Sequence, residues 1–169
     1  MHGMSERDGT RADSEVRRII LLVVSVVNLL LLDAVTKELA VRYLDGSAAI
    51  SVVDGFFSLC YVENRGCAWG MFQGQVWPLA IFGIVALVFL VWKRREVFGL
   101  SLIGTIAEPL LYAGIIGNLI DRVVRGCVID FINLHWRTMY AFPCFNIADI
   151  CISLAAALLL FTAFRSTSK

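Results

Sequence analysis

The stretch from Val76 to Trp92 contains no charged residue, and this uninterrupted apolar run limits the folds open to the chain. Crossing the hydrocarbon of a bilayer takes about 20 mostly apolar residues. Trp77 and Trp92 bracket the run, as expected of aromatic anchors at the two membrane interfaces. The chain has 169 residues, 59% of them hydrophobic, against roughly 45–50% in soluble domains. The run therefore indicates an integral membrane protein rather than a soluble core.

Three further segments are long and apolar enough to span a membrane, at about residues 19–40, 97–120 and 147–164. The last but one is interrupted by Glu108-Pro109. The first follows Arg17 and Arg18 as a signal peptide would, but it lacks a small-x-small cleavage site, so we interpret it as a retained helix. We expect an all-α membrane protein with four transmembrane helices, forming one integral-membrane domain over residues 1–169. Residues 1–16 are expected to be a disordered cytoplasmic tail.

Basic residues are distributed unevenly between the two sides of this predicted bundle. One side carries Arg7, Arg11, Arg17, Arg18, Lys93, Arg94, Arg95, Arg165 and Lys169. The basic residues of the other side are fewer, spread over longer connections and mixed with acids. Because cytoplasmic loops carry the excess of Lys and Arg, both chain termini are predicted to be cytoplasmic. The connections 41–75 and 121–146 then face outward.

Neither outer connection has the composition of a plain loop. Residues 50–62 are rich in β-branched and aromatic side chains, and Asp54-Gly55 is a hairpin-turn signal. We expect a small extracytoplasmic β-sheet there. The segment Val128 to Phe145 is too apolar for a loop, and we interpret it as a short interfacial segment that dips into the membrane surface.

Net charge and cysteine spacing argue against two classes of partner. A formal net charge of +1 does not favour nucleic acid, which would require a basic patch or stripe. The cysteines form no CxxC pair, so we expect no metal site, and we interpret them as small packing residues. They are Cys60, Cys67, Cys127, Cys144 and Cys151.

Polar side chains gather at the outer ends of the hydrophobic segments, where an ionised carboxylate is costly and by default suggests a functional site. They are Asp33, Lys37, Asn64, Asn118, Asp121, Arg122, Asp130, Asn146 and Asp149. Helical spacing of three or four residues places those of one span on one face. The predicted topology puts all of them at one depth, where mutual hydrogen bonds would satisfy them.

Ion pairing within one helix is the simplest explanation for the charged residues of the first and third spans, each of which holds an acid beside a base. Asp130 and Asp149 have no basic residue three or four positions away. Asn146 fits the N-cap of the last helix. Two carboxylates held close together cannot both ionise, and such a pair is able to activate water and protonate a leaving group. The spacing permits Asp130 and Asp149 to meet but does not establish it.

Five short blocks resemble, in their order, the bacterial signal peptidase II family, the lipoprotein signal peptidases. The blocks are Asp33–Lys37, Asn64–Gly70, Gly114–Arg122, Val128–Phe131 and Phe145–Asp149. The resemblance extends from about Arg17 to Phe164. It implies an aspartic endopeptidase of the bacterial inner membrane. Its substrate would be a prolipoprotein whose cysteine carries a diacylglyceryl group, and the cut would fall just before that cysteine.

The resemblance also assigns expected roles. Asp130 and Asp149 correspond to the catalytic pair, and the sheet would form a cradle over the substrate. Residues expected to bind substrate or support the site are Asp33, Lys37, Asn64, Gly66, Asn118, Asp121, Arg122 and Asn146. We expect a monomer that contacts membrane lipid and the lipid-modified prolipoprotein, with no nucleic acid, no cofactor and no metal.

Two other classes of function remain as alternatives. A small proton- or ion-coupled transporter would also place acids in the membrane, but it would need charges through the depth of the bundle. Apart from Glu108, the acids here crowd toward one side. A non-catalytic scaffold could use the outer sheet to bind a partner. The sequence leaves open what Glu108 does and whether the cysteines on the outer side are oxidised.

Overall fold

The structure is a computed structural model that describes residues 2–67, 71–136 and 140–167. Residues 68–70, within the block that begins at Asn64, and residues 137–139, within the apolar second connection, lie outside the described residues. The described chain forms α1 (His2–Leu44), β1 (Ile50–Val53), β2 (Phe57–Asn64), α2 (Val76–Trp92), α3 (Arg94–Phe98), α4 (Leu102–Arg125), β3 (Val128–Trp136), β4 (Tyr140–Ala141) and α5 (Ile147–Thr167).

Three helical segments of the described chain are long and apolar enough to cross a membrane, namely Asp13–Leu44, Leu102–Arg125 and Ile147–Arg165. They correspond to three of the four predicted spans. α2 has the bounds predicted for the remaining span, and its 17 residues make it a shorter apolar helix. The structure is therefore a mostly helical membrane protein with a small antiparallel sheet.

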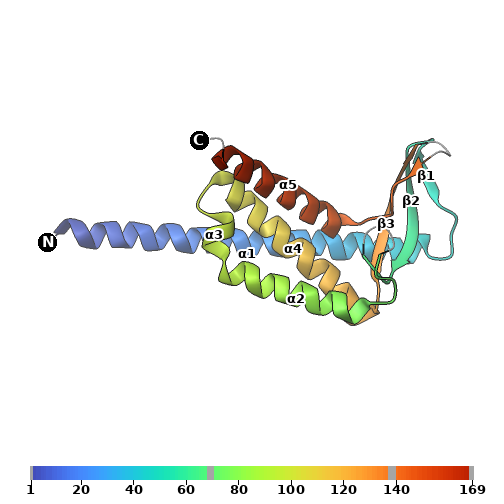
Figure 1. The fold of residues 1–169 in the computed structure, drawn as a ribbon, viewed down its shortest axis with the longest axis horizontal. Coiled ribbons are helices and arrows are strands. Elements are labelled where there is room, and N and C mark those ends of the chain that lie inside the picture. Colours follow the sequence, from blue (N-terminus) through green and yellow to red (C-terminus); the bar gives the residue numbers. More distant parts are fainter. Residues whose placement is uncertain (1, 68–70, 137–139, 168–169) are drawn as a thin grey trace.

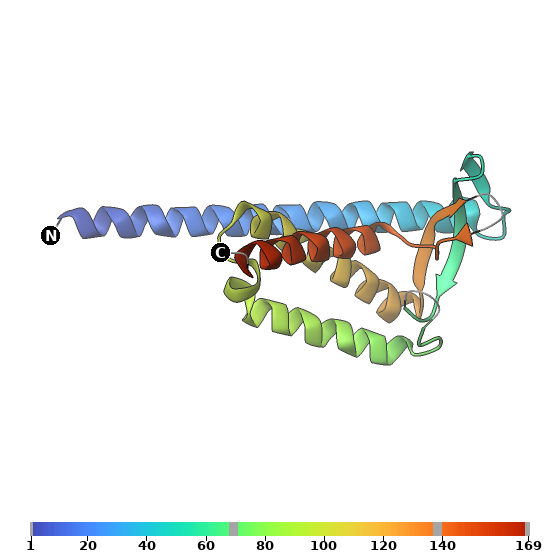
Figure 2. The same cartoon turned by 45° about the horizontal axis from the view of Figure 1, so that its top comes forward.

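α1 is longer than the predicted span at both ends. Residues 2–16, expected as a disordered tail, continue the helix, which ends at Leu44 rather than at residue 40. In Figures 1 and 2 the N-terminal part of α1 projects past the other helices. Helical hydrogen bonds lie within a single segment, so a helix is able to extend beyond the bundle that it packs in.

α4 occupies the centre of the bundle, in contact with α1, α2 and α5. It begins at Leu102 rather than at residue 97 because the Ser101 side chain caps it, accepting a hydrogen bond from the Gly104 amide at 3.0 Å. Its C-terminus is set by Gly126, which has a φ of +70° and follows the last helical residue. The start of the predicted span is taken by the short helix α3.

α4 and α5 approach each other closely at Gly114. A Cβ atom on Gly114 would lie 2.5 Å from the Ala148 carbonyl oxygen, so a larger residue would push the two helices apart. Nearby, Tyr112 and Ala107 of α4 pack with Ala155 of α5 in a buried apolar cluster. This close approach brings the start of α5 against the polar residues of α4.

The predicted hairpin is present. β1 and β2 pair antiparallel around the turn at Asp54-Gly55, where Gly55 has a φ of +73°. The full sheet has the order β1-β2-β3-β4, with antiparallel neighbours.

β3 lies where an interfacial segment was expected, and that expectation was wrong. Val128 to Phe131 are all buried, and the strand pairs with β2 from Val128 to Leu134. Ile129 and Phe131 pack with Ala40 and Leu44 from the last turns of α1. A strand buried on both faces lacks the alternation of a half-exposed strand, so periodicity alone does not separate it from an interfacial segment.

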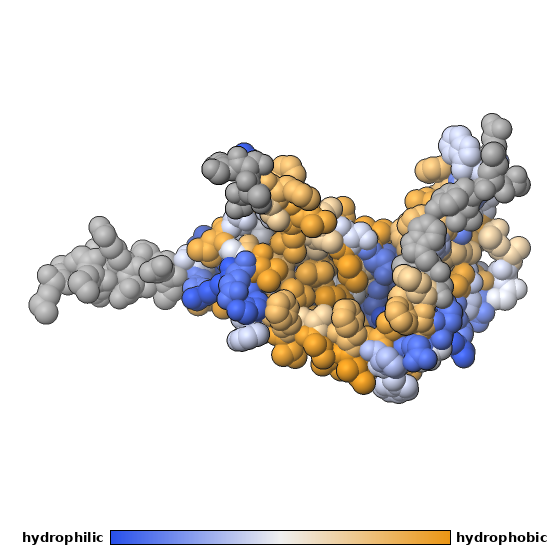
Figure 3. Space-filling model, in the orientation of Figure 1, coloured by the Kyte–Doolittle hydropathy of each residue, from blue (hydrophilic) through white to orange (hydrophobic). Residues whose placement is uncertain are grey.

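The sheet stands across one end of the helices, as Figures 1 and 2 show. In Figure 3 hydrophobic residues cover the helical part, and hydrophilic residues gather near α3 at one end and near the sheet at the other. Large apolar side chains such as Phe82 and Trp92 are more than two-thirds exposed, at 71% and 75%. Such an apolar belt between two polar ends fits a bilayer.

Candidate active site

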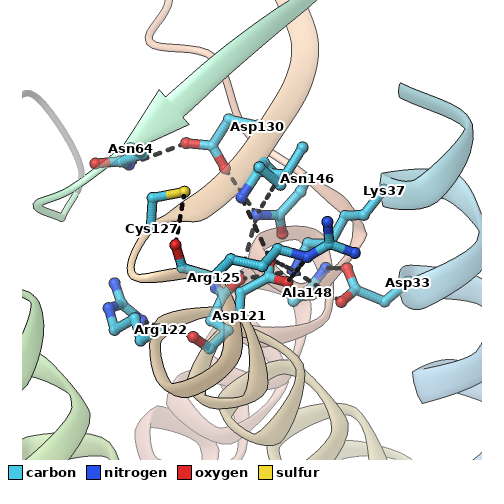
Figure 4. A network of polar contacts seen from close by, with 12 residues as sticks. Asp33, Lys37, Asn64, Asp121, Arg122, Arg125, Cys127, Asp130, Asn146 and Ala148 are labelled. Carbon is cyan, nitrogen blue, oxygen red and sulfur yellow. Dashed lines mark hydrogen bonds and ion pairs between the residues drawn. The ribbon is translucent and has the colours of Figure 1, made fainter. Parts of the chain in front are cut away.

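Asp130 lies in β3 and is almost completely buried, with 1% of its surface exposed. Its Oδ1 accepts a hydrogen bond from Asn146 Nδ2 at 2.7 Å, and its Oδ2 accepts one from Asn64 Nδ2 at 2.9 Å. Figure 4 shows the carboxylate between these two amides. Among the described residues no basic side chain lies within ion-pair distance of it. Both side-chain hydrogen bonds given for this buried acid within the described residues come from neutral amides.

Asp149 lies in the first turn of α5 and is half-buried. Its Oδ1 accepts a hydrogen bond from Asn118 Nδ2 at 2.8 Å. Its Oδ2 accepts one from the Asn146 amide at 3.2 Å, while its own amide donates to Asn146 Oδ1 at 3.0 Å. This reciprocal pair is the arrangement of a capping box, and it gives Asn146 the N-cap position expected from the sequence.

Asn146 joins the two acids. It is completely buried, its side-chain amide donates to Asp130, and its backbone amide donates to Asp149. The same Nδ2 also lies 3.2 Å from Asn118 Oδ1. The structure therefore brings Asp130 and Asp149 to one point, a meeting that the sequence permitted without establishing.

The surroundings of Asp130 favour its protonated form. Burial raises the pKa of this carboxyl, and the negative charge of Asp149 adds to the rise. Hydrogen bonds from Asn64 and Asn146 and the charge of Lys37 lower the pKa in part, since they stabilise the carboxylate, and the net pKa is about 7. A carboxyl that keeps its proton near neutral pH is able to act as an acid.

Lys37 of α1 is the centre of a polar layer next to the two acids, formed with Asp33, Asp121 and Asn118. It is 2% exposed, and its ammonium lies 2.8 Å from Asp33 Oδ2 and 2.9 Å from Asp121 Oδ2. Its third hydrogen bond goes to Asn118 Oδ1 at 3.1 Å. All three donors of the ammonium are satisfied, and through Asn118 the cation is connected to Asp149.

Asp33 connects α1 to α5. Its Oδ1 accepts a hydrogen bond from the Ala148 amide at 2.9 Å, so the first helix satisfies a free amide at the start of the last one. Gly117 leaves the space for this contact, because a Cβ there would lie 2.6 Å from Asp33 Oδ2. The sequence analysis placed Asp33 among the residues that bind substrate or support the site but gave it no partner in α5, since spacing along the chain does not reveal contacts between helices.

Arg122 and Gly66 fix the loop that directly follows Asn64, the last residue of β2. Arg122 donates to the Gly66 carbonyl at 3.1 Å and to the Asn118 carbonyl at 3.3 Å. The Gly66 amide in turn donates to Asn64 Oδ1 at 2.9 Å, which orients Nδ2 of that side chain toward Asp130. A Cβ on Gly66 would lie 2.5 Å from the Met71 carbonyl oxygen, so the tight turn requires glycine.

Asp121 does not pair with the base beside it in the sequence, Arg122. Its ion pairs are with Lys37 and with Arg125 Nε at 3.3 Å, and Arg122 points to Gly66 instead. Asp121 Oδ2 also accepts the Ile129 amide at 3.2 Å, which ties α4 to β3. Arg125 was missed by the sequence reasoning, although its i+4 spacing from Asp121 was an available signal.

Glu108, whose role the sequence left open, lies far from this site at the α3 end of α4. It is 1% exposed and pairs with Arg94 and with Arg18, the latter at 3.2 Å. Arg18 also donates to the Gly99 carbonyl at 2.8 Å. Among the described residues, no group of three or more His, Cys, Asp or Glu side chains is placed to hold a metal ion.

Comparisons with known proteins give matches over most of the chain. The family model described as Signal peptidase (SPase) II matches residues 25–165. The lipoprotein signal peptidase of Syntrophotalea carbinolica is 40% identical over 151 residues, covering 88% of this chain and 92% of the relative. That of Symbiobacterium thermophilum is 36% identical over 141 residues, covering 83% and 90%. A bacterial membrane enzyme solved by the in meso method at 2.3 Å resolution superposes with a TM-score of 0.77 at 30% identity, covering 87% of this chain and 89% of that one.

The fold and the family match are those of a bacterial membrane peptidase of the aspartic class. The chain belongs to the signal peptidase II family. Its activity is the removal of signal peptides from prolipoproteins. The transporter alternative has no support from these matches.

Proposed function

We propose that Asp130 and Asp149 are the catalytic dyad of this peptidase. The observation that carries the proposal is the position of Asn146, which is completely buried and donates to both acids. Two carboxylates that bond to two N–H groups of one residue, with no ion pair to either among the described residues, are poorly able to ionise together. The raised pKa of Asp130 supports a pair that shares one proton near neutral pH.

The dyad works by moving protons to and from one water molecule. The ionised acid removes a proton from the water, whose oxygen attacks the carbonyl carbon of the scissile peptide. The protonated acid then donates its proton to the leaving nitrogen as the C–N bond breaks. Because coupled acids titrate as a unit, the two roles belong to the pair.

The surrounding residues hold the acids in place. Asn118 accepts a hydrogen bond from Lys37 and donates one to Asp149. Lys37 therefore orients the Asn118 side chain, which in turn orients Asp149. Asn64 holds the other acid from β2. We assign to Arg122 and Gly66 the positioning of Asn64, and to Asp33 and Asp121 the neutralisation of Lys37.

The proposed substrate is a prolipoprotein whose cysteine carries a diacylglyceryl group, cut on the N-terminal side of that cysteine. The site supports this because the acids lie where the apolar helices meet the sheet. Acyl chains would stay in lipid beside the helices while the peptide reaches Asp130. Exposed apolar side chains on the β1–β2 hairpin, such as Val53 and Phe56 at 51% and 48%, suit a membrane interface.

For the topology, we propose four spans in the inner membrane with both termini cytoplasmic. α2 supplies the fourth span, since its 17 residues are at the short limit for crossing and Trp77 and Trp92 at its ends are largely exposed. The basic residues around α3 favour the cytoplasm. The sheet and the dyad then lie at the outer face of the membrane, and the protein acts as a monomer.

Cleavage of a lipidated prolipoprotein by the purified protein in detergent tests the dyad. Asp130→Asn and Asp149→Asn should each lower the rate by about 1000-fold or more while the protein remains folded and inserted. Asp54→Asn, which changes an exposed acid in the hairpin turn, is the matched control and should keep full activity. Full activity of either dyad variant would overturn the assignment.

A further inference from the structure

Two cysteines of the sheet lie in contact although they are 84 residues apart in the chain. Cys60 Sγ and Cys144 Sγ are 2.9 Å apart, closer than two sulfur atoms that merely pack. Both side chains are half-buried. Cys60 belongs to β2, and Cys144 lies on the strand-like segment that leads from β4 to α5. Neither residue has a role in the proposed dyad.

Two irregularities in the sheet bring these thiols together across β3. The β2–β3 register shifts between Leu59 and Val62, next to Cys60. On the other side, Phe142 donates to the Leu134 carbonyl and the Phe145 amide to the Ile132 carbonyl, so one extra residue is accommodated around Cys144. Bulged residues leave the regular ladder and bend the strand. Each cysteine therefore lies at a point where the regular pairing of its segment with β3 is interrupted.

We propose that Cys60 and Cys144 form a disulfide bond in the membrane-inserted protein. The proposal rests on the proposed topology, which places the sheet outside the cytoplasm, where disulfides form and persist. The bond would connect β2, which carries Asn64, to the segment that enters α5, which carries Asn146. It would thereby tie together the two amides that hold Asp130.

The oxidation needs an acceptor, which we take to be the disulfide of a thiol–disulfide oxidoreductase on the same side of the membrane. The Cys144 thiolate attacks one acceptor sulfur and releases the other as a thiolate. Cys60 then loses its proton to solvent and its sulfur attacks Cys144 Sγ, releasing the second acceptor sulfur. Two protein thiols give up two electrons and two protons, and the acceptor disulfide becomes two thiols.

The surroundings favour Cys144 as the attacking thiolate. The hydrogen bond from Cys60 lowers the pKa of Cys144 to about 6, and Asn133 Nδ2 contributes a second bond at 3.2 Å. Hydrogen bonding to Cys144 and burial raise the pKa of Cys60 well above its usual range. Cys144 is thus the thiol that reacts first as a thiolate, and Cys60 reacts second.

Counting free thiols in protein taken directly from bacterial membranes tests the proposal. The membranes are quenched in acid, denatured and alkylated, and the intact mass of the purified chain is measured. Of the five cysteines, three should be alkylated without reduction and five after reduction. Peptide mapping should find Cys60 joined to Cys144. Five alkylated cysteines without reduction, or a different joined pair, would overturn the proposal.

Matched variants separate this inference from the proposed function. Cys60→Ser should show four alkylated cysteines with and without reduction, whereas Cys151→Ser, which removes a buried thiol of α5, should gain two on reduction. The thermal midpoint of the unchanged protein should fall with reductant by about 5 °C or more, and that of Cys60→Ser should not respond. Asp130→Asn should lose activity and keep the disulfide, so failure of the dyad and failure of the disulfide give different results.

Discussion

Two buried carboxylates at opposite ends of the bundle have different partners. Glu108 and Asp130 are both 1% exposed. Glu108 is enclosed by the guanidinium groups of Arg18 and Arg94, whereas Asp130 is held by the amides of Asn64 and Asn146. The two acids are thus equally buried but differ in the charge of their partners. Only Asp130 is proposed to exchange a proton, and its partners in the two hydrogen bonds are neutral.

The largest effect is expected from giving Asp130 a cation like those of Glu108. Asn64→Lys would place an ammonium beside the carboxylate, lower its pKa and keep it ionised at neutral pH. We expect peptidase activity on a lipidated substrate to fall by about 100-fold or more. Asn64→Gln, which keeps a neutral amide, is the control and should retain far more activity. Equal activity of the two variants would show that the charge of the partner does not matter.

Removing the cation from the polar layer should cost the most stability. Lys37→Met leaves Asp33 and Asp121 without their shared partner, and breaking a buried ion pair in this way costs about 3–5 kcal/mol. The free energy of unfolding in detergent measures the loss. Adding Asp33→Asn and Asp121→Asn to the same chain should recover part of it, because no unpaired charge then remains. A Lys37→Met protein as stable as the unchanged one would contradict this account.

A milder change beside Asp130 should shift the pH profile of the peptidase activity. Asn64→Ala removes a hydrogen bond that lowers the pKa of Asp130, so the pKa should rise above about 7. The acid then keeps its proton to higher pH, and the alkaline limb of kcat/KM should move upward. We expect kcat to fall by roughly 10-fold, the equivalent of one lost hydrogen bond to a charged group. Asn28→Ala, on an exposed face of α1, should leave the limb in place, and a downward shift in Asn64→Ala would refute the assigned sign.

The smallest effect should follow from changing Glu108. Glu108→Gln leaves the side chains of Arg18 and Arg94 without their carboxylate, but these are 17% and 25% exposed and lie near the end of the bundle. We expect a loss of about 1–3 kcal/mol in unfolding free energy and an unchanged kcat. A loss of kcat at constant substrate affinity would mean that this end of α4 communicates with the dyad.

The fold was predictable where one residue pattern allows one structure. The bounds of the helix from Val76 to Trp92 were predicted correctly, because an uncharged run with a tryptophan near each end is compatible with few other structures. The hairpin at Asp54-Gly55 was predicted for a similar reason. β3 was not, since a strand buried on both faces and an apolar segment at the membrane surface share a composition.

The site was predictable as a set of residues and much less as a set of contacts. Helical spacing predicts partners within one helix, such as Asp33 and Lys37, which do pair. It does not give the rotation of one helix against another, on which the contact between Lys37 and Asp121 depends. The bond from Ala148 to Asp33 joins residues 115 apart, and only the packed bundle reveals it.

That last bond has a consequence for the order in which the newly made protein matures. A chain synthesised as far as β3 already holds Asp130 but not Asp149, and the Ala148 amide at the start of α5 gains its Asp33 partner only when α5 docks against the earliest helix. In the proposed mechanism the nascent chain therefore remains an inactive precursor until its last described helix has entered the membrane. Peptidase activity then appears in a single late step, when the start of α5 docks against α1 and brings Asp149 to Asp130.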